Sequence, residues 1–170
     1  LVSLADPDSL DTMMTLATAI AQGESGEVLA LHVHERLDPE SSLLKAATQY
    51  HTDEVPVHPL PRIGRDPGEG IVAAATERKA DLLMLCWRGH TRSRGAFMGQ
   101  VLDHVMGHAP CNLIIVRDRG LKQIRRLLIP TAGGPHTPVA ARVALAIARA
   151  NEATVTLLYV CRPGASEEDR

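Results

Sequence analysis

The sequence predicts an α/β protein: a five-stranded parallel sheet with flanking helices, followed by the β-α-β start of a second copy. Three observations favour this fold. Apolar runs alternate with helical segments, the continuous apolar run at 81–87 is typical of a buried parallel strand, and the chain contains an internal repeat. Because 45% of the residues are hydrophobic and only 2% are aromatic, the core must be mainly aliphatic.

The repeat aligns residues 1–33 with residues 128–160 at a constant offset of 127 positions, without a gap. A strand, a turn, a helix and a second strand all match in register. The identical pairs are Leu1/Leu128, Ala5/Ala132, Ala17/Ala144, Ala19/Ala146, Ile20/Ile147, Ala21/Ala148, Val28/Val155, Leu31/Leu158 and Val33/Val160. We therefore predict a complete domain over 1–118, a polar linker over 119–126 and the N-terminal part of a second, truncated domain over 127–170.

The first half of the complete domain contains two strands and two helices. The apolar run 1–5 predicts the first strand, and the turn 6–9 supplies capping residues for a helix over 10–22. The run 27–33 predicts the second strand, and a helix is expected over 39–50.

The second half continues the alternation. A weak strand is expected over 55–62, because its prolines cannot donate to a ladder, and a helix should start at Pro67. The buried strand 81–87 follows, then a helix over 99–109 and a last strand over 111–117.

Charge and cysteine content narrow the class of protein. The net charge of −2 gives no electrostatic argument for nucleic acid or an anionic membrane surface, and no uninterrupted apolar run is long enough to span a bilayer. Cys86, Cys111 and Cys161 are far apart, so we expect reduced thiols at strand ends and a cytoplasmic location. Because the chain opens on Leu1 inside an apolar run, we expect it to be part of a longer protein.

The loop 86–100 is the candidate ligand-binding segment. It follows the buried strand and leads into a helix N-terminus, a position that favours anions. Gly89 and Gly99 would let the backbone approach a ligand. The cationic or titratable residues of the loop are Arg88, His90, Arg92 and Arg94. The alternative is a surface turn with solvated arginines; no Walker-type loop or dinucleotide fingerprint is present.

The stretch 81–117 resembles the C-terminal half of universal stress protein domains. Their signature is G-x2-G-x9-G-[ST], then a helix, H-A-P-C and a final strand; "HAPC" occurs here at 108–111. The openings "LVSLADP" and "RRLLIPTAGGPHT" also resemble that family. The resemblance implies tandem copies that pair through their last strands. In nucleotide-binding members, it implies ATP between the first-strand turn and the glycine loop.

The family signature falls on Cys86, Gly89, Gly99 and Gln100, so two of its four positions are retained. The acidic residue that ATP-binding members carry after the first strand is replaced by Ala5, with Asp6 one residue later. The resemblance therefore implies a degenerate site for ATP or another adenine nucleotide. Its candidate residues are Ala5, Asp6, Val33, Arg88, Gly89, His90, Arg92, Gly99 and Gln100.

Other polar groups favour packing over chemistry. His104 and His108 are four residues apart on one predicted helix, a spacing that can bind a metal, but no glutamate completes a motif and we expect no metal site. His32 and His34 share one strand face and are expected to pack at the core or its rim. The loop 131–137 lacks the pattern of an adenylating enzyme. No spacing indicates a catalytic nucleophile, so we expect no enzyme activity.

The words "CWRGHTR" and "PTAGGP" resemble universal stress domains appended to membrane transporters, such as amino-acid permeases and cation/proton antiporters. We therefore expect a regulatory domain on the cytoplasmic side of a transporter in the same chain. The alternatives are a free-standing ATP-binding tandem universal stress protein and a nucleotide hydrolase. The half-domain should expose an apolar face, so we expect a homodimer, pairing between domains within the chain, or a disordered C-terminus beyond Arg162.

Overall fold

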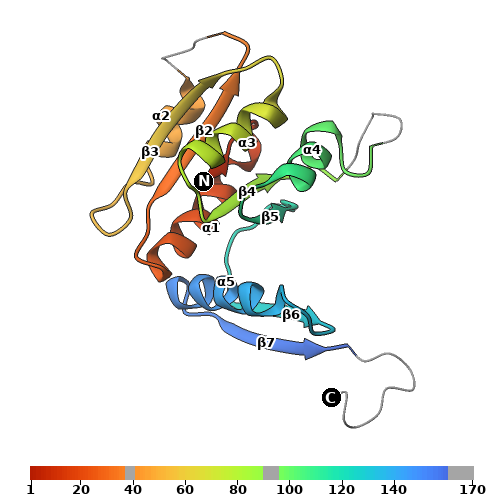
Figure 1. The fold of residues 1–170 in the computed structure, drawn as a ribbon. Helices are drawn as coiled ribbons and strands as arrows, with labels where there is room; N and C mark the ends of the chain where they lie inside the picture. Colours follow the sequence, from red (N-terminus) through yellow and green to blue (C-terminus); the bar gives the residue numbers. More distant parts are fainter. Residues whose placement is uncertain (37–40, 90–95, 161–170) are drawn as a thin grey trace.

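The computed structural model describes residues 1–36, 41–89 and 96–160. Within them, five parallel strands form one sheet in the order β3-β2-β1-β4-β5, and β6 and β7 form a second parallel sheet (Figure 1). The strands are β1 Val2–Ser3, β2 Val28–His34, β3 Val57–Ile63, β4 Leu82–Cys86, β5 Asn112–Val116, β6 Arg126–Thr131 and β7 Thr154–Tyr159. The helices are α1 Leu10–Gly23, α2 Ser42–Thr48, α3 Pro67–Glu77, α4 Gln100–His108 and α5 Thr137–Ala150, with a short 3-10 turn at Pro7–Ser9. The predicted fold class is confirmed.

Helices cover both faces of the five-stranded sheet, and each face has its own aliphatic core. On one face, α1 and α2 contribute Met13, Met14 and Leu44 to a cluster that includes Val2 of β1. On the other face, the second cluster contains residues of α3 and α4, and Leu31 of β2 is fully buried in it. A parallel sheet covered in this way needs apolar residues on both sides of its central strands.

Most elements lie within one residue of their predicted bounds, and three differ from the prediction by more than that or in the extent of their pairing. The strand expected over 1–5 has only two paired residues, although Leu4 still donates its N–H to Leu31 O at 2.8 Å. The helix expected over 39–50 is α2, which covers Ser42–Thr48, and residues 37–40 are not described. The strand predicted as weak, β3, pairs with β2 along all of Val57–Ile63. Its prolines are tolerated because β3 is an edge strand, where a missing N–H can face outward.

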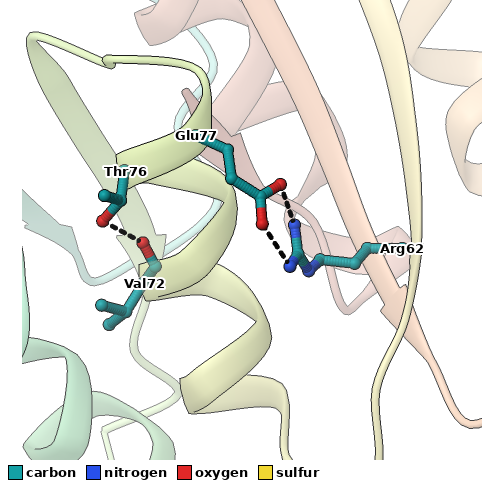
Figure 2. Close-up of polar contacts among 4 residues, drawn as sticks. All are labelled: Arg62, Val72, Thr76 and Glu77. Atoms are coloured by element: carbon teal, nitrogen blue, oxygen red, sulfur yellow. Dashed lines mark hydrogen bonds and ion pairs between the residues drawn. The ribbon is translucent and has the colours of Figure 1, made fainter.

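A bidentate ion pair connects the edge strand β3 to α3 (Figure 2). The guanidinium of Arg62 donates to the carboxylate of Glu77 at 2.7 and 2.8 Å, which lowers the pKa of Glu77. One residue earlier, the hydroxyl of Thr76 donates to Val72 O at 2.9 Å. The helix starts at Pro67, as predicted, and Asp66 caps it by accepting the N–H of Glu69 at 3.0 Å.

Cys86 ends β4 and Cys111 precedes β5, and both are free thiols, as predicted. Burial raises the pKa of the Cys111 thiol and so disfavours its reactive thiolate. Cys161 lies outside the described residues. Among the helices that the structure describes, none has the length and hydrophobicity that a bilayer crossing requires.

The second unit, β6-α5-β7, contacts the first through helices that occupy equivalent places in the repeat. The helix α5 packs against α1, where Gly23 leaves room for Ala146, and Arg142 pairs with Glu24 at 3.4 Å. The resemblance implied pairing through last strands, whereas in the described residues the two units meet through α1 and α5 (Figure 1). Small side chains on these helices explain the close contact. The segment predicted as a polar linker also contributes Ile124 to the core beside α1.

One face of the two-stranded sheet is apolar and exposed, as expected. Leu158 is 48% exposed, whereas its repeat equivalent Leu31 is fully buried beneath α3 and α4. The large exposed residues of this face are Leu128 and Leu158, with Val160 just beyond the strand. Leu157 and Tyr159 are also exposed, but they alternate with these residues along β7 and lie on the opposite face. Pairing with a second chain remains a prediction, and the segment beyond Arg162 lies outside the described residues.

The contact between α1 and α5 predicts a cost for any side chain at Gly23. A Cβ added there would lie 2.5 Å from the Cβ of Ala146, so Gly23→Ala should reduce the free energy of unfolding by about 1–3 kcal/mol. Chemical denaturation measures this difference. The matched control is Gly26→Ala, whose added Cβ would meet its nearest neighbour at 3.8 Å. Equal stability of the two variants would contradict close packing of the units.

The lowered pKa of the Asp118 carboxyl predicts that the stability of the chain depends on pH. Burial raises the pKa of its carboxyl, but bonds from the N–H groups of Gly120 and Leu121 and from Thr12 outweigh burial and hold the pKa below 3.8. Such a group contributes stability above its unfolded pKa and loses that contribution as pH falls through the folded value. Asp118→Asn should therefore destabilise the chain by less than about 1 kcal/mol at pH 7, because the group is partly exposed.

Denaturation curves from pH 7 to pH 2 test this prediction. The difference between the wild type and Asp118→Asn should shrink below about pH 4. The exposed Asp53, replaced by Asn, serves as the control. A difference that is constant over the whole pH range would contradict the assignment.

Candidate functional site

A cavity of about 480 Å³ lies at the carboxyl ends of β1 and β4, where the strand order of the sheet reverses. Its walls come from the ends of β1, β2 and β4, from the start of α3 and from the segment that enters α4. The lining residues are Ser3, Leu4, Ala5, Asp6, Ser9, Val33, Pro67, Ile71, Leu85, Cys86, Trp87, Arg88, Met98, Gly99, Gln100, Val101 and Leu102. Its volume falls in the range of small-molecule sites.

The structure brings most of the sequence-predicted site residues to this cavity. Those that line it are Ala5, Asp6, Val33, Arg88, Gly99 and Gln100. Gly89 lies beside the cavity without lining it, and His90, Arg92 and Arg94 lie outside the described residues. The sequence therefore predicted residues that the structure brings together at one cavity, and that they form a binding site remains a prediction. Residues 90–95 of the predicted phosphate loop are not described.

The two retained glycines of the loop both have backbone conformations that favour glycine. Gly89 has φ of 82°, and an added Cβ would lie 2.5 Å from a guanidinium nitrogen of Arg117. Gly99 has φ of 121° and precedes the first residue of α4. Since other residues rarely adopt such angles, the backbone path of the loop depends on these two glycines.

An ion pair joins the ends of β1 and β4 across the cavity. Arg88 lies 2.9 Å from a carboxylate oxygen of Asp6, whose side chain is 20% exposed. The other oxygen of Asp6 accepts the N–H of Asp8 at 3.2 Å and caps the 3-10 turn. Both carboxylate oxygens of Asp6 are therefore bound by groups of the chain itself.

A second carboxylate, which the sequence analysis missed, lies at the start of α4. Asp103 accepts the N–H of Phe97 at 2.7 Å and the N–H of Met98 at 2.9 Å. Its own N–H donates to Gly99 O at 2.9 Å within the helix. Asp103 thus closes the end of the loop onto the helix. A short acidic residue in the first turn of a helix was the available sequence signal.

Trp87 was also missed as a site residue. Its ring lines the cavity, and the guanidinium of Arg117, at the end of β5, lies over the ring at 5.0 Å from its centre. The buried Nε1 atom of Trp87 has no hydrogen-bond partner within the described part of the chain. An isolated tryptophan at a strand end, in a chain with so few aromatic residues, was the signal.

The floor of the cavity is aliphatic and comes from α3, α4 and the strands. Ile71 and Leu102 are nearly fully buried there, and Val33 packs so closely on α3 that a Cβ at Gly70 would lie 2.9 Å from it. Among the described residues, the titratable side chains that line the cavity are those of Asp6, Cys86 and Arg88. This arrangement can hold an apolar ring and a few hydroxyl groups.

The histidine pairs take part in packing. The Nδ1 atom of His32 is 2.6 Å from Leu4 O, and the ring of His34 lies edge-on to it at 3.6 Å. His104 packs against Gly68 of α3, and His108 bonds through Nδ1 to His104 O at 2.8 Å. Within the described residues, no three metal-binding side chains gather into one group.

The family model described as "Universal stress protein family" matches residues 1–117 and again residues 123–170. The chain belongs to the universal stress protein family. It is 30% identical over 177 aligned positions to the Na(+)/H(+) antiporter NhaS5 of Synechocystis sp. (strain PCC 6803), an alignment that covers 95% of this chain. The chain spans only 25% of that relative's length.

A solved structure of this family has a similar fold. It is a crystal structure of a universal stress protein in complex with cAMP, with a TM-score of 0.56 and 22% sequence identity. The similarity covers 68% of this chain and 94% of the other protein. At this level of identity, the likeness supports the α/β fold.

The two bonds to Asp103 predict that this side chain stabilises the end of the loop 86–100. Asp103→Ala removes the acceptor of two backbone N–H groups, which should cost about 0.5–1.5 kcal/mol because water can reach them, and should speed amide exchange at residues 97 and 98. Hydrogen exchange measures the effect. Asp103→Asn, which keeps one acceptor oxygen, should give an intermediate result. Unchanged exchange at both amides would contradict this role.

Proposed function

We propose that this chain is a non-catalytic regulatory module, on the cytoplasmic side of a membrane transporter in the same polypeptide, which senses an adenine-containing ligand. The observation that carries the proposal is the similarity of nearly the whole chain to a quarter of an antiporter's length. A module of this kind would bias a transporter through a ligand-dependent difference in its contacts.

The cavity between β1 and β4 supports the sensing part of the proposal. It lies where open parallel sheets bind ligands, and the related structure with cAMP belongs to the same family. Cys86, Gln100 and Ala5 replace family residues that would face a nucleotide. Each unpaired ligand group costs on the order of 1–3 kcal/mol, so we expect weak binding of ATP in the family's usual manner.

The contacts around the cavity favour binding over turnover. Ser9 bonds through its hydroxyl to Asp6 O at 3.1 Å, and among the described residues no histidine lines the cavity to act as its base. We therefore propose binding without hydrolysis. The exposed apolar face of β6 and β7 further supports pairing between universal stress units, within the chain or in a homodimer.

Blocking the cavity tests the sensing function. Calorimetric titration with AMP, cAMP and Mg-ATP should show saturable binding of at least one ligand. Ala5→Phe, at an exposed lining position, should weaken that binding at least tenfold because the ring enters the cavity. Ala5→Ser is the matched control. Binding that survives Ala5→Phe would place the ligand elsewhere, and steady phosphate release from ATP would contradict a non-catalytic role.

The transporter link has a separate test. Sequencing the transcript on both sides of this region should reveal hydrophobic spans in the same reading frame. An open reading frame that encodes only universal stress domains would instead support the free-standing alternative.

A further inference from the structure

We infer that the cavity selects an uncharged, nucleoside-like ligand over a polyphosphate, because among the described residues carboxylates of the chain already bind one arginine and two backbone N–H groups that could hold phosphate. This inference rests on the proposed function, in which the cavity binds an adenine-containing ligand. It names the chemical class of that ligand. Three features of the cavity support it: the arginine paired with Asp6, the two backbone N–H groups that donate to Asp103, and the aliphatic floor.

The arginine of the cavity is paired with an internal anion. Arg88 lies 2.9 Å from Asp6 Oδ2, and Asp6 is held in place from its other oxygen by the N–H of Asp8. A phosphate that reached Arg88 would have to displace this carboxylate or lie beside it. Like charges repel each other, and water screens this repulsion here because the Arg88 side chain is 62% exposed. The pair therefore weakens the attraction that an unpaired arginine would offer.

The backbone donors of the loop are occupied in the same way. Phosphates commonly bind N–H groups where a glycine-rich loop enters a helix. Here Asp103 accepts the N–H groups of Phe97 and Met98, and Met98 itself lines the cavity. A phosphate at this end of the cavity would meet a carboxylate that already holds these two donors. Asp103 therefore places a negative charge in the first turn of α4, which opposes the binding of a phosphate at this helix N-terminus.

Arg117 does not restore the lost attraction. Its guanidinium lies over Trp87 and against Gly89, and Arg117 is not among the residues that line the cavity. The tryptophan ring separates this cation from the space in which a ligand would lie. Within the described residues, the charged side chains that line the cavity are Asp6 and Arg88, which neutralise each other.

The remaining surface of the cavity suits a flat ring with hydroxyl groups. The aliphatic lining residues are Leu4, Val33, Ile71, Leu85, Val101 and Leu102. At the rim, the carboxylate oxygens of Asp6 keep lone pairs that can accept hydroxyl groups, and Ser3 adds another polar atom. A cavity of about 480 Å³ can enclose a nucleoside. Adenosine is therefore the appropriate probe.

Calorimetric titration of the whole chain with adenosine, AMP and Mg-ATP tests the inference. Adenosine should bind at least tenfold more tightly than Mg-ATP, with AMP between them. Asp6→Asn keeps a capping side chain but removes the negative charge beside Arg88, so it should narrow the ratio between the two affinities about tenfold. Asp8→Asn, in the same turn but outside the cavity lining, is the matched control and should leave the ratio unchanged.

The outcomes separate this inference from the proposed function. Mg-ATP binding as tight as adenosine binding would overturn the inference and leave the sensing function standing. An affinity ratio that Asp6→Asn does not change would also overturn it, because the carboxylate would then not be the selecting group. Failure of all three ligands to bind would overturn both. Preference for adenosine that Asp6→Asn reduces and Asp8→Asn preserves would support both.

Discussion

The strand β1 is two residues long and pairs in parallel with β2 on one side and with β4 on the other. Val2 lies opposite Ala30 and Met84, and Leu4 extends the pairing by donating to Leu31 O. Successive crossovers leave β1 in opposite directions, so the loops at its carboxyl end diverge and leave a cavity. The ion pair, the loop glycines and the start of α4 are all positioned relative to this strand. Its pairing is the constraint on which the site depends.

The repeat and the apolar runs made most of this fold predictable, since alternating strands and helices allow few arrangements of a parallel sheet. The prolines of β3 led to the incorrect prediction that this strand would pair only weakly. Residue propensity does not reveal that a strand will lie at the edge of the sheet, where Pro59 and Pro61 are tolerated. The packing of α5 on α1 was not predictable either. It depends on the space beside Gly23, a contact between residues more than a hundred positions apart in the chain.

At the cavity, too, some features were predictable from the sequence and others were not. The place of the cavity was predictable from the strand ends and the loop glycines, which sequence motifs record. The occupation of Arg88 by Asp6, and of two backbone donors by Asp103, depends on side-chain direction that a motif does not encode. A signature compares residues position by position, whereas charge neutralisation is a property of pairs. The proposal of a weakened phosphate site therefore rests on two kinds of observation: the residues that differ from the signature, and the pairs that the structure shows.

Trp87 gives this protein an internal optical reporter. It is the only tryptophan of the chain, it lines the cavity, and the guanidinium of Arg117 lies over its ring. Indole emission responds both to a nearby charge and to the polarity around the ring. A molecule in contact with the ring and a displacement of Arg117 would therefore each alter this emission. Events inside the cavity and at the edge of the sheet can thus be followed on the unlabelled chain.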